Sequence, residues 1–263
     1  MEKLVVTGKN RLSGEVFISG AKNAVVAIIP AAIIAEGVSV IENLPCIEDV
    51  TSFIKTLEDL GIKCNLLNEN TLKIDSTKIK SSIAINDDVT KIRASYYLMG
   101  ALIGRFKKVE VALPGGCNFG SRPIDQHIRG FKALGIDVVV ENNIVKLDGT
   151  NLKGANIYLD MVSVGATINI MLAAVLAKGV TVIENAAKEP HVVDTANFLN
   201  MLGAKVTGAG TDVIRITGVE KLHGGEYTII PDQIEAGTYM IAAAISGGDV
   251  IVRNIIPKHM DSL

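Results

Sequence analysis

The residues with the clearest potential for chemistry lie in one short stretch, 113–125, which contains Cys117, Arg122 and Asp125. Two glycines directly before the cysteine remove side-chain bulk and permit backbone angles that other residues avoid, so the thiol is expected on an exposed, mobile loop. An arginine and a helix start near a thiol favour the thiolate, which a proton donor or nucleophile requires near neutral pH. Pro123 suits a first helical turn, while Arg122 and Asp125 supply donors and an acceptor for a polar, anionic ligand.

The cysteine usage also has a simpler interpretation. The three cysteines, Cys46, Cys64 and Cys117, are odd in number and show no Cys-x-x-Cys spacing. A disulfide framework or a zinc site is therefore not expected, and a reducing cytoplasm is indicated. A lone cysteine is more often inert than reactive, so the chemical interpretation of Cys117 depends on its glycine and arginine neighbours.

Three helix starts could bind anions, because a helix N-terminus carries unpaired N–H groups and the positive end of the helix dipole. Lys22 and Asn23 occupy one first turn, and Ser163 with Val164 begins another. Both patterns also fit ordinary capped helices. Arg93 opens a third helix, where a cation is unfavourable for the dipole; a bound anion or a neighbouring carboxylate would explain it.

The other polar residues indicate structure more than chemistry. Asp232 and Glu235 open a fourth helix, where acidic residues are expected as caps. The four histidines show no metal-ligand spacing, and no glycine-rich nucleotide signature occurs. The sequence thus indicates no metal ion and no nicotinamide cofactor.

The same order of elements recurs about every 70 residues. Each copy contains a helix rich in small residues, expected at 21–35, 93–103, 163–177 and 235–245. A strand follows each helix, at 38–41, 109–112, 180–183 and 250–252. A second, amphipathic helix then ends on a Leu-Gly pair in three copies, where glycine is the expected cap, at Gly61, Gly135 and Gly203. Two short strands complete the unit, the second at 72–75, 145–148 and 214–217.

This β-α-β-α-β-β unit predicts an α/β fold. Helices that are apolar on all sides must be buried, so we expect them to pack together inside, with the sheets and the amphipathic helices outside. Three complete copies predict one domain over residues 22–231, which carries the Cys117 loop. Residues 1–21 and 232–263 are expected to form part of a second domain, truncated within a repeat, so the chain is expected to be the front part of a longer protein.

Composition limits the classes of function. The chain has 263 residues, 48% of them apolar, and 26 basic against 28 acidic residues give a formal net charge of −2. This balance gives no excess of positive charge that would attract nucleic acid or an anionic membrane. The opening strand expected at 3–8 is too short and polar-flanked for a signal peptide, and the longest apolar run is shorter than the roughly 18 to 20 residues of a membrane span. A soluble, cytoplasmic protein is expected.

Six motifs in this order resemble the UDP-N-acetylglucosamine 1-carboxyvinyltransferase (enolpyruvyl transferase) family over the whole chain. They are Gly20-Ala21-Lys22-Asn23, Ile92-Arg93-Ala94-Ser95, Leu113-Pro114-Gly115-Gly116-Cys117, Gly120-Ser121-Arg122-Pro123-Ile124-Asp125, Ser163-Val164-Gly165-Ala166-Thr167 and Asp194-Thr195-Ala196-Asn197-Phe198-Leu199. The resemblance implies two inside-out α/β barrels of three units each, the second incomplete here. It also implies the first committed step of peptidoglycan synthesis, in which the enolpyruvyl group of phosphoenolpyruvate passes to the 3-hydroxyl of UDP-N-acetylglucosamine and phosphate is released.

The resemblance assigns catalytic roles to three residues. Lys22 would bind phosphoenolpyruvate, Cys117 would protonate its methylene carbon, and Arg122 would face the anionic substrates. Further contacts would hold the sugar, the uridine and the diphosphate of the nucleotide; these substrate-binding residues are Asn23, Arg93, Pro123, Ile124, Asp125, Gln126, Ser163 and Val164.

The resemblance also implies a missing partner and leaves two alternatives. The family's catalytic aspartate and several arginines lie beyond Leu263, so this chain is expected to be inactive without the C-terminal half of its own protein. The first alternative is a shikimate-pathway enolpyruvyl transferase, which shares the fold and phosphoenolpyruvate but lacks the loop cysteine. The second is a non-catalytic UDP-sugar-binding paralogue, which would tolerate Cys117→Ala without losing nucleotide affinity.

Overall fold

The strands form three four-stranded sheets and one two-stranded sheet within residues 3–113 and 124–261, the part of the chain that this computed structural model describes. The first sheet has the order β13 (Glu226–Thr228), β2 (Val38–Glu42), β4 (Thr71–Asp75), β3 (Lys63–Asn68). The second has the order β5 (Ile83–Ala84), β6 (Lys108–Ala112), β8 (Ile144–Asp148), β7 (Asp137–Glu141). The third has the order β9 (Asn156–Tyr158), β10 (Val180–Glu184), β12 (Val213–Thr217), β11 (Lys205–Thr207). The two-stranded sheet pairs β1 (Ser13–Phe17) with β14 (Asp249–Arg253).

The three larger sheets are built alike, as the repeat predicts. Each has one parallel pair, β13 with β2, β5 with β6 or β9 with β10, followed by two antiparallel pairs. Along β4, Leu72 and Ile74 are buried while Lys73 between them is exposed. Because alternate side chains point to opposite faces, each sheet covers the core with one face and leaves the other open.

The expected helices are present. Those rich in small residues are α1 (Lys22–Ala32), α4 (Tyr97–Arg105) preceded by the 3-10 helix η1 (Arg93–Tyr96), α6 (Val164–Ala174) and α8 (Gln233–Ser246). The second helices of the units are α2 (Glu48–Asp59), α5 (Asp125–Ala133) and α7 (Pro190–Met201), with the short α3 (Asp87–Lys91) and η2 (Pro257–Met260) between or after units. All three predicted capping glycines have positive φ, at +86° for Gly61, +79° for Gly135 and +100° for Gly203.

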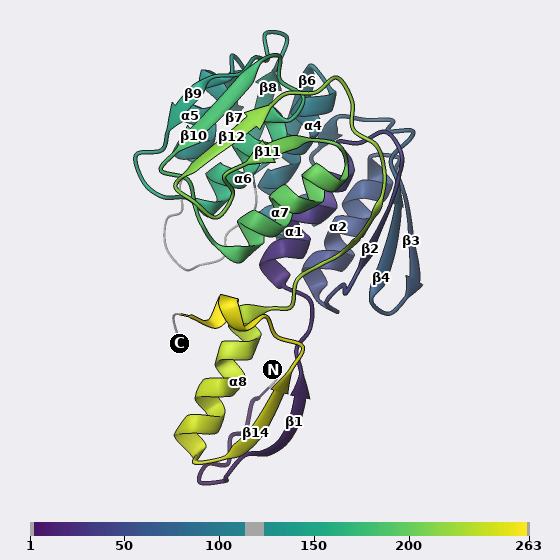
Figure 1. Cartoon of the computed structure of the whole chain (residues 1–263). Helices are drawn as coiled ribbons and strands as arrows, with labels where there is room; N and C mark the ends of the chain where they lie inside the picture. Colours follow the sequence, from purple (N-terminus) through teal and green to yellow (C-terminus); the bar gives the residue numbers. More distant parts are fainter. Residues whose placement is uncertain (1–2, 114–123, 262–263) are drawn as a thin grey trace.

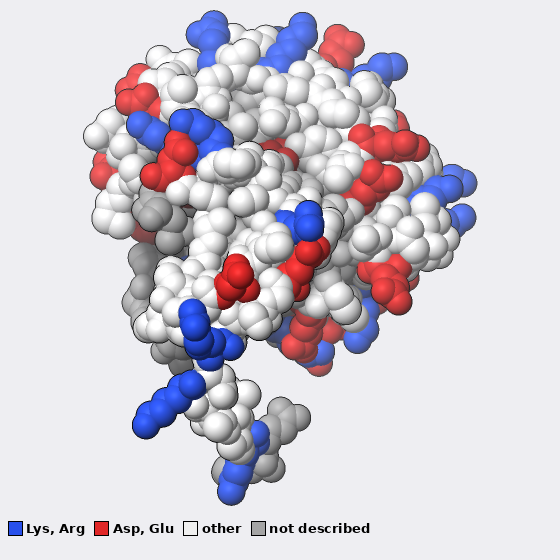
Figure 2. Space-filling model, turned by 60° about the horizontal axis from the view of Figure 1, so that its bottom comes forward, with Lys and Arg blue, Asp and Glu red and all other residues white. Residues whose placement is uncertain are grey.

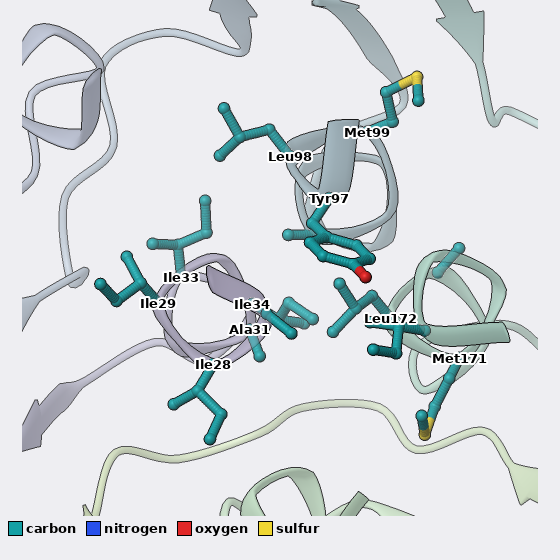
Figure 3. Close-up of a cluster of buried hydrophobic side chains, with 14 of the residues drawn as sticks. Ile28, Ile29, Ala31, Ile33, Ile34, Tyr97, Leu98, Met99, Met171 and Leu172 are labelled. Atoms are coloured by element: carbon teal, nitrogen blue, oxygen red, sulfur yellow. The ribbon is translucent and has the colours of Figure 1, made fainter. Parts of the chain in front are cut away.

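Helices α1, α4 and α6 form the centre of the core. Nine of the 11 residues of α1 and nine of the 11 residues of α6 are buried. Figure 3 shows Ile34, Tyr97 and Leu172 pointing into the space between these helices. The prediction that the apolar helices pack together inside, with sheets around them, is confirmed.

Helix α7 departs from the amphipathic pattern expected for the second helix of a unit. It buries seven of its 12 residues and packs against α1. Two of the polar residues among them have hydrogen-bond partners: the Thr195 hydroxyl donates to the His191 carbonyl at 2.8 Å, and the Asp194 carboxylate accepts from Tyr227. Buried polar groups are tolerated when they are paired in this way.

The opening segment also differs from expectation. Residues 3–8 form no strand, and the chain's first strand is β1. Leu4, Val5 and Val6 are all highly exposed. A strand was expected at 3–8, but a strand requires a paired neighbour, and β14 pairs only with residues 13–17.

Two strands pair with a part of the molecule other than the one that contains the helix following them in sequence; the two parts are the upper and lower parts of Figure 1. Strand β1 leads into α1 but pairs with β14, whereas β13 leads into α8 but pairs with β2. The backbone therefore passes twice between the parts, and the two passages are hydrogen-bonded to each other. Ala21 N–H donates to the Ile230 carbonyl at 2.8 Å, and Asp232 N–H donates to the Ser19 carbonyl at 2.9 Å.

Charged side chains of both signs are interspersed over the face shown in Figure 2. This mixture agrees with the small formal net charge of −2. Within the described ranges, none of the helices has the length and apolar character that a membrane crossing requires.

Candidate active site

A pocket of about 880 Å³ lies where the starts of several helices meet. Its lining includes first-turn or preceding residues of α1, α2, η1, α6, α7 and α8. Four of the predicted site residues line it: Lys22, Asn23, Arg93 and Val164. Because each helix start presents N–H groups and a positive dipole end, the pocket suits an anionic ligand.

Lys22 is held at the pocket by two carboxylates. Its ammonium lies 3.4 Å from an oxygen of Asp49, and its side chain is 55% exposed. Its backbone N–H donates to Asp232 Oδ2 at 2.9 Å, while Asp232 Oδ1 accepts from the backbone of Ile234 and Glu235 at 2.7 and 3.0 Å. Asp232 thus caps both α8, as predicted, and α1. At the start of α1 the ammonium, and not the Lys22 amide, is therefore the group available to a ligand.

Arg93 begins η1, so α4 starts at Tyr97, four residues later than the predicted helix. The side chain is half-buried at the pocket wall and acts electrostatically on His127. Lys91 also lines the pocket, as do the acidic residues Glu48 and Glu189. This mixture of charges suits a ligand that carries both anionic groups and hydroxyls.

The start of α6 combines a cap with an open approach. Ser163 Oγ accepts from Ala166 N–H at 3.3 Å, which confirms the predicted N-cap. Val164 and Gly165 line the pocket. The first N–H groups of a helix have no intrahelical acceptor, so this turn can donate to an anion.

Of the predicted uridine-binding residues, Ile124, Asp125 and Gln126 lie at the start of α5 and are not part of the lining of this pocket. Ile124 is the residue before the helix, and Asp125 and Gln126 are in its first turn. Gln126 Oε1 is buried and has no hydrogen-bond partner among the described residues. The remaining predictions at this loop, for Cys117, Arg122 and Pro123, concern residues outside the described ranges.

His127 is a site residue that the sequence did not single out. It lies in the first turn of α5 and is only 5% exposed. Burial, and then the nearby Arg93 guanidinium, lower the pKa of His127 to about 4, while Asp125 acts in the opposite direction. The spacing of the histidines speaks only to metal binding; the position of His127 two residues after Asp125 was the available signal for this site.

Asp194 is a second buried titratable group. It is the first residue of the last of the six family motifs, to which the resemblance assigned no role. Its carboxylate accepts from the Tyr227 hydroxyl at 2.6 Å and from Ile230 N–H at 3.4 Å. Burial raises the pKa of Asp194 to about 6, against the lowering effect of these two hydrogen bonds. Since Ile230 belongs to the segment that passes between the two parts of the molecule, Asp194 anchors that passage.

The two described cysteines lie in different environments. Cys46 is exposed, and burial raises the pKa of Cys64 to about 12, so Cys64 stays protonated. Across residues 3–113 and 124–261, histidine, cysteine and carboxylate side chains gather in no group of three or more that could hold a metal ion.

Comparisons with known proteins agree with this architecture. The chain is 60% identical to UDP-N-acetylglucosamine 1-carboxyvinyltransferase 2 of Clostridium acetobutylicum and 60% identical to UDP-N-acetylglucosamine 1-carboxyvinyltransferase of Clostridium botulinum, with 100% of this chain and 63% of each relative aligned. The chain thus spans less than two thirds of the length of these relatives.

Solved structures show the same fold. The crystal structure of the enolpyruvyl transferase NikO from Streptomyces tendae matches 89% of this chain and 55% of its own length, with a TM-score of 0.78 and 26% identity. EPSP synthase from Acinetobacter baumannii matches 94% of this chain and 57% of its own, with a TM-score of 0.74 and 21% identity. The family model of EPSP synthase (3-phosphoshikimate 1-carboxyvinyltransferase) matches residues 6–263. Because that match covers nearly the whole sequence, the chain belongs to the EPSP synthase family.

Proposed function

We propose that the complete protein transfers the enolpyruvyl group of phosphoenolpyruvate to the 3-hydroxyl of UDP-N-acetylglucosamine and releases phosphate, in the cytoplasm, as the first committed step of peptidoglycan synthesis. The observation that carries this proposal is the convergence of Lys22, Asn23, Arg93 and Val164 on one pocket. Support also comes from the 60% identity to relatives with that name along the whole chain.

In this proposal the pocket neutralises phosphoenolpyruvate and holds the acceptor sugar. The Lys22 ammonium offsets the charge of the carboxylate and phosphate, and Asp49 keeps it at the pocket until the substrate replaces that exposed ion pair. Asn23, half-buried beside it, contacts the sugar near the reacting hydroxyl. Arg93 adds a second cation to the lining of the pocket.

The nucleotide is proposed to extend from the pocket towards α5. The start of α6, at Ser163 and Val164, binds the diphosphate through backbone N–H groups. Residues 123–126 line the uridine end, where the buried Gln126 Oε1 is an acceptor without a partner among the described residues.

The chemical step is addition followed by elimination. The 3-hydroxyl oxygen bonds to C2 of phosphoenolpyruvate and its proton passes to the aspartate that the C-terminal part supplies, while the Cys117 thiol gives a proton to the methylene carbon, forming a tetrahedral ketal. The Cys117 thiolate then takes a proton back from the new methyl group, the C2–O bond to phosphate breaks, and the departing phosphate takes the proton held by the aspartate. Arg122 faces the anionic substrates during these steps. The roles of Cys117 and Arg122 rest on the family resemblance, because both residues lie outside the described ranges.

We also propose that residues 22–231 form one complete domain and that 1–21 and 232–263 belong to a second. The supporting observation is the pair of neighbouring backbone passages at 19–21 and 230–232. The second domain is proposed to be completed by the C-terminal part of the same protein, which supplies the other half of the active-site cleft.

One alternative acceptor is supported by a specific observation, because the matching family model is described as 3-phosphoshikimate 1-carboxyvinyltransferase. The identity to EPSP synthase of Acinetobacter baumannii is only 21%, against 60% to the UDP-N-acetylglucosamine enzymes. The amino-sugar nucleotide is therefore the better candidate.

The experiment is an assay of phosphate release from phosphoenolpyruvate, with UDP-N-acetylglucosamine, with shikimate 3-phosphate and with neither. The 263-residue chain alone is expected to release none, and the full-length protein is expected to release phosphate only with the sugar nucleotide. Lys22→Gln in the full-length protein should abolish release, whereas Lys178→Gln, at an exposed lysine away from the pocket, should not. Release with shikimate 3-phosphate alone, or no release from the full-length protein, would refute the proposal.

A further inference from the structure

Asn169 joins three helices through one fully buried side chain. It lies in α6 with no solvent exposure. Its Oδ1 accepts from Gly100 N–H at 2.7 Å, and its Nδ2 donates to the Tyr96 carbonyl at 2.8 Å. The same Nδ2 lies 3.0 Å from His127 Nδ1 on α5. The amide therefore connects α6 to the start of α4 and to α5.

Its first two contacts brace the first turn of α4. Tyr96 and Gly100 are four residues apart, the spacing that an α-helical hydrogen bond joins. Gly100 allows α6 this close, because a Cβ there would lie 2.3 Å from the Asn169 carbonyl oxygen and 2.4 Å from Oδ1. The position of Asn169 relative to α4 is thus fixed by contacts on both sides of its amide.

These contacts determine the hydrogen-bonding state of His127. Gly100 N–H can donate only to an oxygen, so the other amide atom of Asn169 must be the nitrogen. That nitrogen is a donor only, so His127 Nδ1 must accept. The proton of the neutral imidazole is consequently on Nε2.

His127 Nε2 lies beside the start of α6. A Cβ on Gly165 would be 3.0 Å from Nε2 and 2.9 Å from the Tyr96 hydroxyl, so only glycine leaves room for these two groups. No residue in the described part of the chain accepts a hydrogen bond from Nε2. Tyr96 and Gly165 both line the 880 Å³ pocket. The free donor therefore lies where a ligand at the α6 start would be bound.

We infer that Asn169 is a positioning residue, which holds His127 as a neutral Nε2–H donor for an oxygen of the nucleotide diphosphate at the start of α6. The identity of this ligand rests on the proposed function, whereas the tautomer of His127 does not.

The surroundings keep His127 neutral. Arg93 from η1 and Asp125 from its own helix are the charged groups that act on it, and Tyr96 from η1 packs against its ring at a centroid distance of 4.8 Å. Helix α6 faces it with the uncharged Asn169. Burial and Arg93 outweigh Asp125, so the pKa of His127 falls to about 4 and the ring stays neutral, with its single proton on Nε2, through neutral pH.

The first test is nitrogen NMR of the chain with ring-labelled histidine, with the His127 signals assigned from His127→Gln. We expect Nε2 to carry the proton, Nδ1 to be an acceptor, and neither signal to titrate between about pH 5.5 and 8. In Asn169→Asp a carboxylate oxygen replaces the donor facing Nδ1, while the other oxygen still accepts from Gly100. The single proton of the neutral ring should then move from Nε2 to Nδ1.

Thr167→Val is the matched control. Thr167 is buried on the same helix, and its hydroxyl accepts from Ala187 N–H at 3.1 Å, away from His127. Its loss should reduce stability without changing the His127 signals. An Nδ1–H tautomer in the wild-type chain, or unchanged signals in Asn169→Asp, would overturn the inference.

The second test is calorimetric titration of the full-length protein and its variants with UDP-N-acetylglucosamine. Losing a hydrogen bond to a charged group should weaken binding about 10- to 100-fold in Asn169→Asp and in His127→Leu. His127→Gln, which keeps a side-chain N–H donor, should lose less than His127→Leu, and this pair keeps the test valid if Asn169→Asp fails to fold. Equal losses in the two His127 variants would refute the donor role. Absence of binding by the wild-type full-length protein, with the expected NMR result, would instead count against the proposed ligand.

Discussion

Helices α1 and α8 are similar in composition but have different surroundings. Both are rich in alanine and isoleucine, yet α1 buries nine of 11 residues and α8 buries two of 14. Helix α1 is covered by α4, α7 and α2, whereas the neighbours of α8 within the described residues are mainly β14 and η2. Composition therefore determines that a helix forms, and the number of packed neighbours determines how much its apolar side chains stabilise the fold.

The largest difference between the two helices should appear when the same side chain is truncated in each. Ile28 of α1 has no exposure, whereas Ile245 of α8 is 86% exposed. Ile28→Ala should lower the free energy of unfolding by about 2–5 kcal/mol because it leaves a cavity. Ile245→Ala should change it by less than about 0.5 kcal/mol. Urea denaturation of both variants checks this, and equal losses would contradict the contrast.

The dependence of stability on pH should also come from the part of the molecule that contains α1, through the buried residues His127 in α5 and Asp194 in α7. The pKa of His127 is about 4 in the folded state, so its contribution is present above about pH 6.5 and is lost as the pH falls towards 4. The pKa of Asp194 is about 6, so its contribution is present at low pH and is lost as the pH rises through 6. The two effects oppose each other between pH 4 and 6.

Asp194→Asn should remove one of these opposing effects. Between pH 6.5 and 4 this variant should lose about 2 kcal/mol more stability than the wild-type chain, since one pKa unit corresponds to about 1.4 kcal/mol and pH 4 still lies slightly above the unfolded pKa of 3.8. His191, whose pKa is also lowered by burial, acts in the same direction as His127. Denaturation curves at pH 4, 5 and 6.5 provide the measurement; a variant that becomes relatively more stable at low pH would show that Asp194 does not titrate as described.

Close packing of α4 against α6 predicts a smaller effect. Gly100→Ala should cost about 1–3 kcal/mol, because the new Cβ would overlap with Asn169 and force the helices apart. Gly104→Ala on the same helix is the control, since its nearest neighbour would be the Leu172 carbonyl oxygen at 3.3 Å. Thermal unfolding should distinguish the two variants, and a Gly104→Ala loss as large as that of Gly100→Ala would argue against the role of Asn169 in this contact.

The smallest effect on stability is expected at the site itself. The Lys22–Asp49 ion pair is exposed, so Lys22→Ala should change the free energy of unfolding by less than about 0.5 kcal/mol. Binding of phosphoenolpyruvate should nevertheless be lost in the complete protein. A large loss of stability would place Lys22 among the structural residues of α1.

Local sequence patterns predicted the elements but not all of their partners. The small-residue helices and the strands that follow them were predicted within a few residues, because a buried helix and a half-buried strand have characteristic periods. The pairing of β13 with β2 was not predicted, since these strands are far apart in sequence and similar in pattern. The strand expected at 3–8 was wrong for the same reason: its pattern does not reveal that β14 pairs elsewhere.

The candidate site was predicted in part. Lys22, Asn23, Arg93 and Val164 were expected at helix starts and line one pocket. The contact of Asn169 with His127 was missed, because a buried polar network depends on how three helices pack and leaves no local signal. The positions of Cys117, Arg122 and Pro123 remain predictions.

The most direct measurement is amide hydrogen exchange of the 263-residue chain with and without UDP-N-acetylglucosamine. If the helix starts form the nucleotide site, the ligand should slow exchange at the beginnings of α5 and α6 and in η1, and should leave the second half of α8 unchanged. Protection confined to α8 and β14, or no protection at η1 and α6, would contradict the assignment of this pocket.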